Sequence, residues 1–171
     1  MLLSCVMIGH SAQSQSLRPI SRTLTKALTD IDAVVDQAEK AAQQISPGEV
    51  KLTERRRTFL DESRHGLVNS VVLVRKQTLG LRNRPTLGNL FVLESVLGNY
   101  ERQLEGMVSQ LNNIELTLIQ NGDPTGKVEL WRENLEKAAN ALGGARLSFS
   151  GEALDLLDHA DKALTRGEKI R

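Results

Sequence analysis

Residues 90–118 read LFVLESVLGNYERQLEGMVSQLNNIELTL, and an apolar or aromatic residue recurs there every three or four positions without a gap. Because an α-helix turns once per 3.6 residues, this spacing places all of these side chains on one stripe of a helix. The strict seven-residue repeat also favours mild left-handed supercoiling against neighbouring helices. The nine positions of the stripe are Leu90, Leu93, Leu97, Tyr100, Leu104, Met107, Leu111, Ile114 and Leu118.

The same spacing recurs in three other segments. It is unbroken from Leu17 to Ile45, where Leu28, Val35 and Ala42 widen the stripe. In the second segment Arg56, Arg64 and Thr78 interrupt it. The sequence therefore predicts four amphipathic helices. Their expected bounds are about 17–45, 47–81, 86–120 and 124–167.

The breaks between these segments are short and have the residues that end and start helices. Ser46-Pro47-Gly48-Glu49 is typical of a capping box with proline at the first helical position. Asn83–Thr86 separates the second helix from the third, and Asn121–Pro124 separates the third from the fourth. Turns this short make consecutive helices antiparallel. We therefore expect an all-α, up-down-up-down four-helix bundle over residues 17–171.

The fourth segment is longer than the others and rich in residues that disfavour a helix. Gly143-Gly144 is followed by Ser148-Phe149-Ser150-Gly151, and each glycine costs about 1 kcal/mol relative to alanine in a helix. We expect this helix to be kinked or broken near residues 143–151.

The composition fits one domain with an aliphatic core. Of the 171 residues, 40% are hydrophobic but only 3% are aromatic, which favours a helical bundle over a β-rich fold. A net charge of +1 argues against nucleic acid as a partner. No apolar run reaches the ~20 residues of a transmembrane helix, so no transmembrane span is expected.

Residues 1–16 contain no Lys, Arg, Asp or Glu, and an apolar run precedes a small polar one. This pattern resembles the end of a secretory signal peptide, with Ala12-Gln13-Ser14 at cleavage-site spacing. It predicts a periplasmic or secreted protein. Two alternatives stay open: a disordered tail on a cytoplasmic protein, and a lipoprotein box at Leu2–Cys5.

No catalytic, cofactor or metal site is predicted. A di-iron centre needs two Glu-x-x-His motifs, and the sequence has one, Glu62–His65. The phase of its helix turns Glu62 and His65 away from the core, and His159 is likewise on an outer face. No Cys-x-x-Cys-His motif, nucleophile motif or phosphate-binding loop is found. We therefore expect a protein that is not an enzyme.

Charge is unevenly divided between the second and third helices. Residues 49–84 hold nine Lys or Arg against four acids, whereas residues 85–121 hold one against four. Opposite charges on neighbouring flanks help to set helix pairing. We favour that explanation over a polyanion-binding face formed by Arg55, Arg56, Arg57, Arg64, Arg75 and Lys76.

Two hypotheses of function follow. The first is an extracytoplasmic binding or structural protein that meets a protein partner or a second copy through small residues of the third helix, namely Ser95, Gly98, Gly106 and Ser109. The second is a small-ligand-binding or sensory bundle with a polar pocket near Arg64 and Thr78. In either case Trp131 is expected to be buried against alanines of the first and fourth helices.

Overall fold

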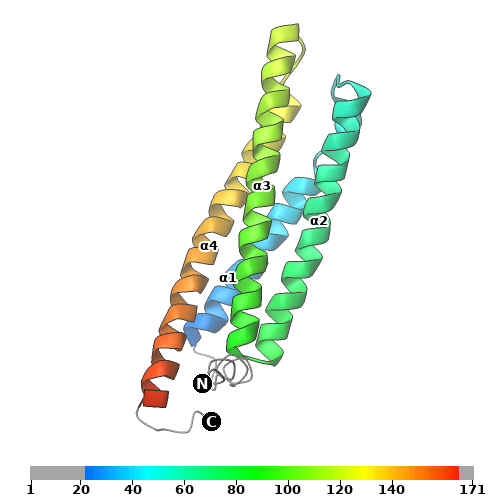
Figure 1. Cartoon of the computed structure of the whole chain (residues 1–171). Coiled ribbons are helices and arrows are strands. Elements are labelled where there is room, and N and C mark those ends of the chain that lie inside the picture. Colours follow the sequence, from blue (N-terminus) through cyan, green and yellow to red (C-terminus); the bar gives the residue numbers. More distant parts are fainter. Residues whose placement is uncertain (1–21, 166–171) are drawn as a thin grey trace, which may run out of the picture.

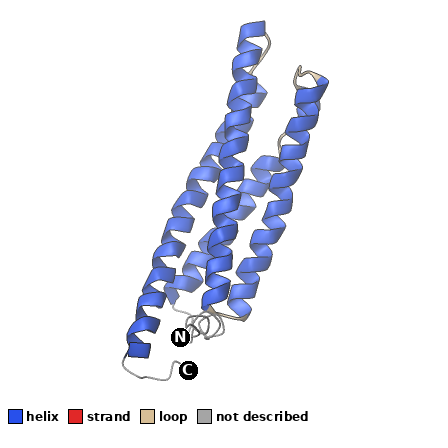
Figure 2. Cartoon of the chain, viewed as in Figure 1, coloured by secondary structure: helices blue, strands red, loops and turns tan. Residues whose placement is uncertain are grey.

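The computed structural model describes residues 22–165, which contain four long helices and one short 3-10 helix (Figures 1 and 2). This confirms the predicted all-α four-helix bundle. The expected start at residue 17 and end at residue 167 lie outside the described residues. The elements are α1 (Arg22–Gln43), η2 (Pro47–Glu49), α2 (Glu54–Asn83), α3 (Leu87–Asn121) and α4 (Gly126–Thr165).

Each helix packs against two others, in the ring order α1, α2, α3, α4 and back to α1. Figure 1 shows the chain reversing its direction at every turn. Ion pairs Lys51–Asp123, at 3.0 Å, and Lys127–Glu49 join the first and third connections at one end of the bundle. The α2–α3 turn lies at the opposite end (Figure 1).

The core is the set of stripes that the periodicity predicts. All nine positions of the α3 stripe are buried. In α1 the stripe positions Leu24, Ala27, Ile31, Ala38 and Ala41 are buried as expected, together with the widening residues, whereas Val34 is half-buried. Trp131 is 4% exposed, which confirms its predicted burial. The largest contribution to stability therefore comes from aliphatic side chains that meet at the bundle axis.

The second helix begins at Glu54, and the prediction of a start at residue 47 is wrong. Pro47–Glu49 form a single 3-10 turn, and the Ser46 side chain makes no capping hydrogen bond. The chain then continues without helix to Thr53, whose side chain accepts a hydrogen bond from the Arg56 backbone N–H at 3.4 Å. Val50 is buried on this stretch, so tertiary packing overrides the local capping signal.

The fourth helix runs without interruption from Gly126 to Thr165, so the expected break near residues 143–151 is not found. Phe149, in the middle of that segment, is completely buried. Burying an aromatic side chain gains about 1.5–3 kcal/mol, which offsets the helix-propensity cost of the neighbouring glycines. The Ser150 hydroxyl also lies within hydrogen-bond distance of the Arg146 carbonyl, at 2.9 Å.

Tyr100 places a hydroxyl in this aliphatic core. The side chain is 1% exposed, and its hydroxyl has no hydrogen-bond partner in the described part of the chain. Burial, reinforced by the nearby negative charge of Glu39, raises the pKa of Tyr100 above its ordinary value of about 10. The folded protein thus holds a proton at high pH that the unfolded chain loses.

We expect Tyr100→Phe to raise the free energy of unfolding by about 1 kcal/mol, because it removes a buried unpaired hydroxyl. The wild-type contribution of Tyr100 is constant below pH 10 and falls as the pH rises above 10, by up to about 1.4 kcal/mol per pH unit. Urea unfolding of both proteins at pH 8, 10 and 11 checks this. A difference between the two proteins that does not widen above pH 10 would contradict it.

A candidate interaction groove between two helices

Arg146 of α4 holds α4 to α3 through two carboxylates. Its Nε donates to Glu94 at 2.9 Å and its Nη1 donates to Glu101 at 2.5 Å. The Ser150 hydroxyl donates to the other oxygen of Glu94 at 2.8 Å. The hydrogen bond to Glu101 is the main cause that raises the pKa of Arg146. Such charge-assisted bonds are stronger than neutral ones, and they fix the register of the two helices.

Gly98 makes room for the Arg146 guanidinium. A Cβ at Gly98 would lie 3.1 Å from the Arg146 Cζ, tighter than ordinary contact. Gly98 is buried for this reason, while Ser95, Gly106 and Ser109 are exposed. The four residues predicted as one interaction strip are therefore divided by the structure. Gly98 serves the contact between α3 and α4, and only the other three lie open.

We expect Gly106→Ala to raise the free energy of unfolding by about 0.5–1 kcal/mol, because alanine is the better helix former and its Cβ would meet nothing within 4 Å. Gly98→Ala is expected to gain less or to destabilise, because it displaces the Arg146 guanidinium. Chemical denaturation followed by circular dichroism measures both. In an Arg146→Met background the two substitutions should converge; persistence of the full difference there would contradict the role of Arg146.

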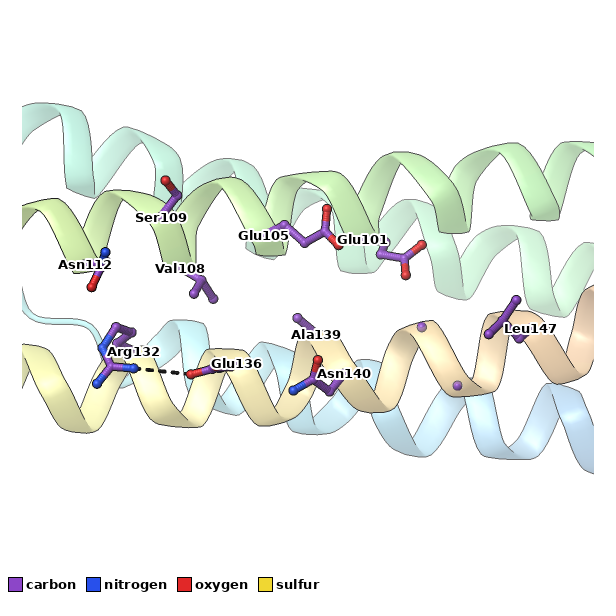
Figure 3. Close-up of a pocket in the computed structure, with 12 residues that line it drawn as sticks. Glu101, Glu105, Val108, Ser109, Asn112, Arg132, Glu136, Ala139, Asn140 and Leu147 are labelled. Atoms are coloured by element: carbon purple, nitrogen blue, oxygen red, sulfur yellow. Dashed lines mark hydrogen bonds and ion pairs between the residues drawn. The ribbon is translucent and has the colours of Figure 1, made fainter.

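Beside this ion-pair cluster, α3 and α4 leave a groove of about 660 Å3 (Figure 3). Small residues keep it open: Ser109 comes from α3, and Ala139, Gly143 and Gly144 come from α4. A Cβ at Gly143 would lie 2.9 Å from the Glu101 carboxylate, whereas one at Gly144 would meet nothing within 4 Å. The other lining residues are Glu101, Glu105, Val108, Asn112, Arg132, Glu136, Asn140 and Leu147.

The groove has an acidic lining. Arg132 is held by Glu115 at 2.8 Å and Glu136 at 3.2 Å, and the hydrogen bond to Glu115 raises the pKa of Arg132. Glu101 forms an ion pair with Arg146. Glu105 has no ion-pair partner among residues 22–165, so a free carboxylate remains on the α3 side (Figure 3).

One large apolar side chain is exposed to solvent at the edge of this groove. Leu147 is 76% exposed, more than any other large apolar residue in the described part of the chain. Side chains of this kind are ordinarily found singly on protein surfaces, but here the neighbouring surface is concave and floored by small residues.

The two residues predicted as a polar intrusion satisfy their polar groups within α2. The Thr78 hydroxyl is buried and donates to the Arg75 carbonyl at 2.9 Å. Arg64 pairs with Asp61, with its Nη2 at 2.8 Å from the Asp61 Oδ1. Neither side chain lines the α3–α4 groove.

The histidines of the described chain lie on the surface, as the helix phase predicts. The Nδ1 atoms of His65 and His159 each lie within hydrogen-bond distance of the carbonyl four residues earlier, at 2.8 and 2.6 Å. Within residues 22–165, no three His, Cys, Asp or Glu side chains are grouped to hold a metal ion. None of the described helices has a stretch long and apolar enough to cross a membrane.

Helices α2 and α3 are neighbours, as expected, but the arginines of α2 do not pair with the carboxylates of α3. Arg75 pairs with Asp36 and Glu39 of α1, each at 2.6 Å, and Arg82 pairs with Asp32 of α1 at 2.6 Å. In the described chain no ion pair joins α2 to α3. The reason is that three of the four carboxylates of α3 lie on the flank that faces α4 and pair with arginines there.

The link between α2 and α3 is instead made by uncharged side chains. The Ser70 hydroxyl donates to the Gln103 side chain at 2.7 Å. The sequence patterns did not predict the ion pairs of Arg146 or the groove, although one pattern points to the ion pairs. Glu94 and Glu101 are seven residues apart, which places both on one flank of the helix.

Comparison with protein-family models, with curated proteins and with solved structures finds no match.

Proposed function

We propose that this chain is a non-catalytic, extracytoplasmic helical bundle that binds a protein partner through the groove between α3 and α4. The observation that carries the proposal is Leu147, which is largely exposed at the edge of a concave surface floored by Ala139, Gly143 and Gly144. Small residues let another helix approach closely, and an exposed apolar residue supplies buried area when it does.

The charges of the groove indicate the chemistry of the partner. Its carboxylates, Glu101, Glu105 and Glu136, outnumber its one cation, Arg132. Two copies docked groove to groove would bring like charges together, which is unfavourable. A helix that carries Lys or Arg beside an apolar stripe fits better. In a second copy of this chain, α2 has the greatest excess of such residues.

A photo-crosslinking amino acid at position 147 tests the surface in the native host. We expect it to capture a discrete protein, and the same probe at Leu130 to capture none. Leu130 is a matched control, because it is also on α4 and 55% exposed but does not line the groove. Gly144→Glu should abolish capture without unfolding the protein, since its Cβ has open space. Equal labelling from both positions would contradict the proposal.

Sedimentation velocity at tens of micromolar separates the two kinds of partner. A dimer or larger assembly that Gly144→Glu dissolves would identify a second copy. If the protein sediments strictly as a monomer, the partner is a different protein. A strict monomer that also gives no site-specific crosslink would overturn the proposal.

The extracytoplasmic location rests on the uncharged residues 1–16. We expect cell fractionation to place the protein outside the cytoplasm, and sequencing of its N-terminus to show cleavage near Ala12-Gln13-Ser14. A cytoplasmic protein that keeps Met1 would contradict export while leaving the groove untouched.

A further inference from the structure

The first turns of α2 pack little against their own chain. Every residue from Thr53 to Phe59 is exposed, and Leu60 is the first buried residue of the helix. Figure 1 shows this end of α2 beyond the end of α1. We call residues 53–59 the tip of α2. An exposed helix segment of this kind is available for contact with another molecule.

The tip carries positive charge that its own chain does not neutralise. The arginines of α2 that form ion pairs are Arg64, Arg75 and Arg82. In the described part of the chain, the three arginines at positions 55–57 have no ion-pair partner, and Glu54 is the one acid of the tip. Because arginine presents a rigid fork of donors to a carboxylate, these side chains suit an acidic partner.

Two of these arginines flank an aromatic side chain. Arg55 and Arg56 lie four and three residues before Phe59, which places the three on one face of the helix. All three line one shallow hollow, which Arg57 does not line. Phe59 is 56% exposed. Arginine and aromatic residues are among those that most often carry the binding energy of protein interfaces.

The groove between α3 and α4 offers the complementary groups. Leu147 is exposed at its edge, and Glu105 has no ion-pair partner in the described chain. The ion pair of Arg146 with Glu101 puts Glu101 and Leu147 at nearly the same level of the bundle. Glu105 follows Glu101 by four residues, so it lies about 6 Å further along α3.

The spacing of the tip matches that of the groove. Arg55 precedes Phe59 by four residues, which is again about 6 Å along the helix. With Phe59 packed on Leu147, the guanidinium one turn earlier lies at the level of the unpaired carboxylate. The tip is then antiparallel to α3. The small residues that floor the groove leave room for its backbone.

We propose that the tip of α2 in one copy of the chain binds the α3–α4 groove of a second copy. This inference rests on the proposed function, and it names a second copy as the partner. The contact joins opposite charges, unlike one from groove to groove. Because tip and groove are different surfaces, a dimer keeps one free tip and one free groove, to which further copies can add.

Mixing two single variants of the full chain tests this. Phe59→Glu spoils the tip and keeps the groove, whereas Gly144→Glu blocks the groove and keeps the tip. In sedimentation velocity at tens of micromolar, the wild-type protein should form dimers and larger assemblies, and each variant alone should be a monomer. Their equimolar mixture should stop at a dimer of one copy of each, because it holds one intact tip and one intact groove. A mixture that stays monomeric would overturn the inference.

Charge reversal tests the pairing of Arg55 with Glu105. Arg55→Glu should weaken self-association about tenfold, and adding Glu105→Arg to it should restore most of the loss. Arg57→Glu is the matched control. It makes the same charge change at an exposed position off the binding face, so its effect should stay below about twofold. Unchanged melting temperatures check that the variants fold. Equal losses at both positions without rescue would contradict this pairing.

The outcomes also separate this inference from the proposed function. If the photo-crosslinker at position 147 captures a different protein and the chain is a monomer, the groove binds a partner and the second copy is wrong. If Gly144→Glu dissolves the assembly but Phe59→Glu does not, the groove binds another surface of the second copy, and the role of the tip is refuted. The absence of both crosslink and assembly would overturn the two proposals together.

Discussion

Replacing Trp131 with alanine is expected to lower the free energy of unfolding by about 3–5 kcal/mol. The indole is 4% exposed and lies on α4 one turn from Asn134, whose amide bonds Gln44 at the end of α1. The last turns of α1 bury Ala38, Ala41 and Ala42. Small side chains there let the two helices approach closely, so that no neighbour can expand to fill the space that an indole leaves.

Guanidinium unfolding followed by circular dichroism measures this loss, since Trp131 is the single tryptophan and the variant has no tryptophan fluorescence. Leu130→Ala is the control. It removes an apolar side chain from the adjacent, exposed position and should change stability by less than about 0.5 kcal/mol. A loss below about 1 kcal/mol for Trp131→Ala would mean that the indole packs little against α1.

Phe149→Ala is expected to cost a similar amount, about 3–5 kcal/mol. Phe149 is completely buried in the part of α4 where the glycines and serines favour a break. If the helix is continuous, the phenyl ring fills the core between the ends of the bundle and its loss leaves a cavity. If residues 143–151 were an irregular segment, the ring would not be held in the core and the loss would be small.

The control for Phe149 is Leu147→Ala, two residues away and largely exposed, which should leave stability within about 0.5 kcal/mol. Denaturation midpoints and slopes of both variants against wild type make the comparison. A cost below about 1 kcal/mol for Phe149→Ala, equal to that of the control, would contradict the continuous helix.

The stripes of α1 and α3 could be predicted because a regular repeat determines which side of a helix is buried, whatever the neighbours are. The start of α2 and the continuity of α4 could not. Both depend on one buried side chain, Val50 or Phe149, whose packing acts against the local preference, which around Phe149 amounts to about 1 kcal/mol for each glycine. Local signals decide helix ends where tertiary contacts are weak.

The candidate groove was harder to predict than the core. Helix phase separates inner from outer faces, but it does not say which flank meets which neighbour. Gly98 was therefore assigned to an outer strip, although Arg146 of α4 covers it. The acidic flank of α3 could have been found from the seven-residue spacing of Glu94 and Glu101. The arginine that binds both comes from another helix, so its pairing required the three-dimensional arrangement.

The ion pairs between the long helices join α1 to α2 and α3 to α4, and each of these two pairs of helices has its own surplus of charge by composition. Arginine and lysine exceed the acids in the α1–α2 pair, and acids exceed them in the α3–α4 pair. The described part of the chain is therefore an electric dipole directed across its width, although the full chain has a net charge of only +1. A cationic protein is attracted to the α3–α4 side and oriented before contact, and the rate of this association falls as the ionic strength rises and the Debye length shortens.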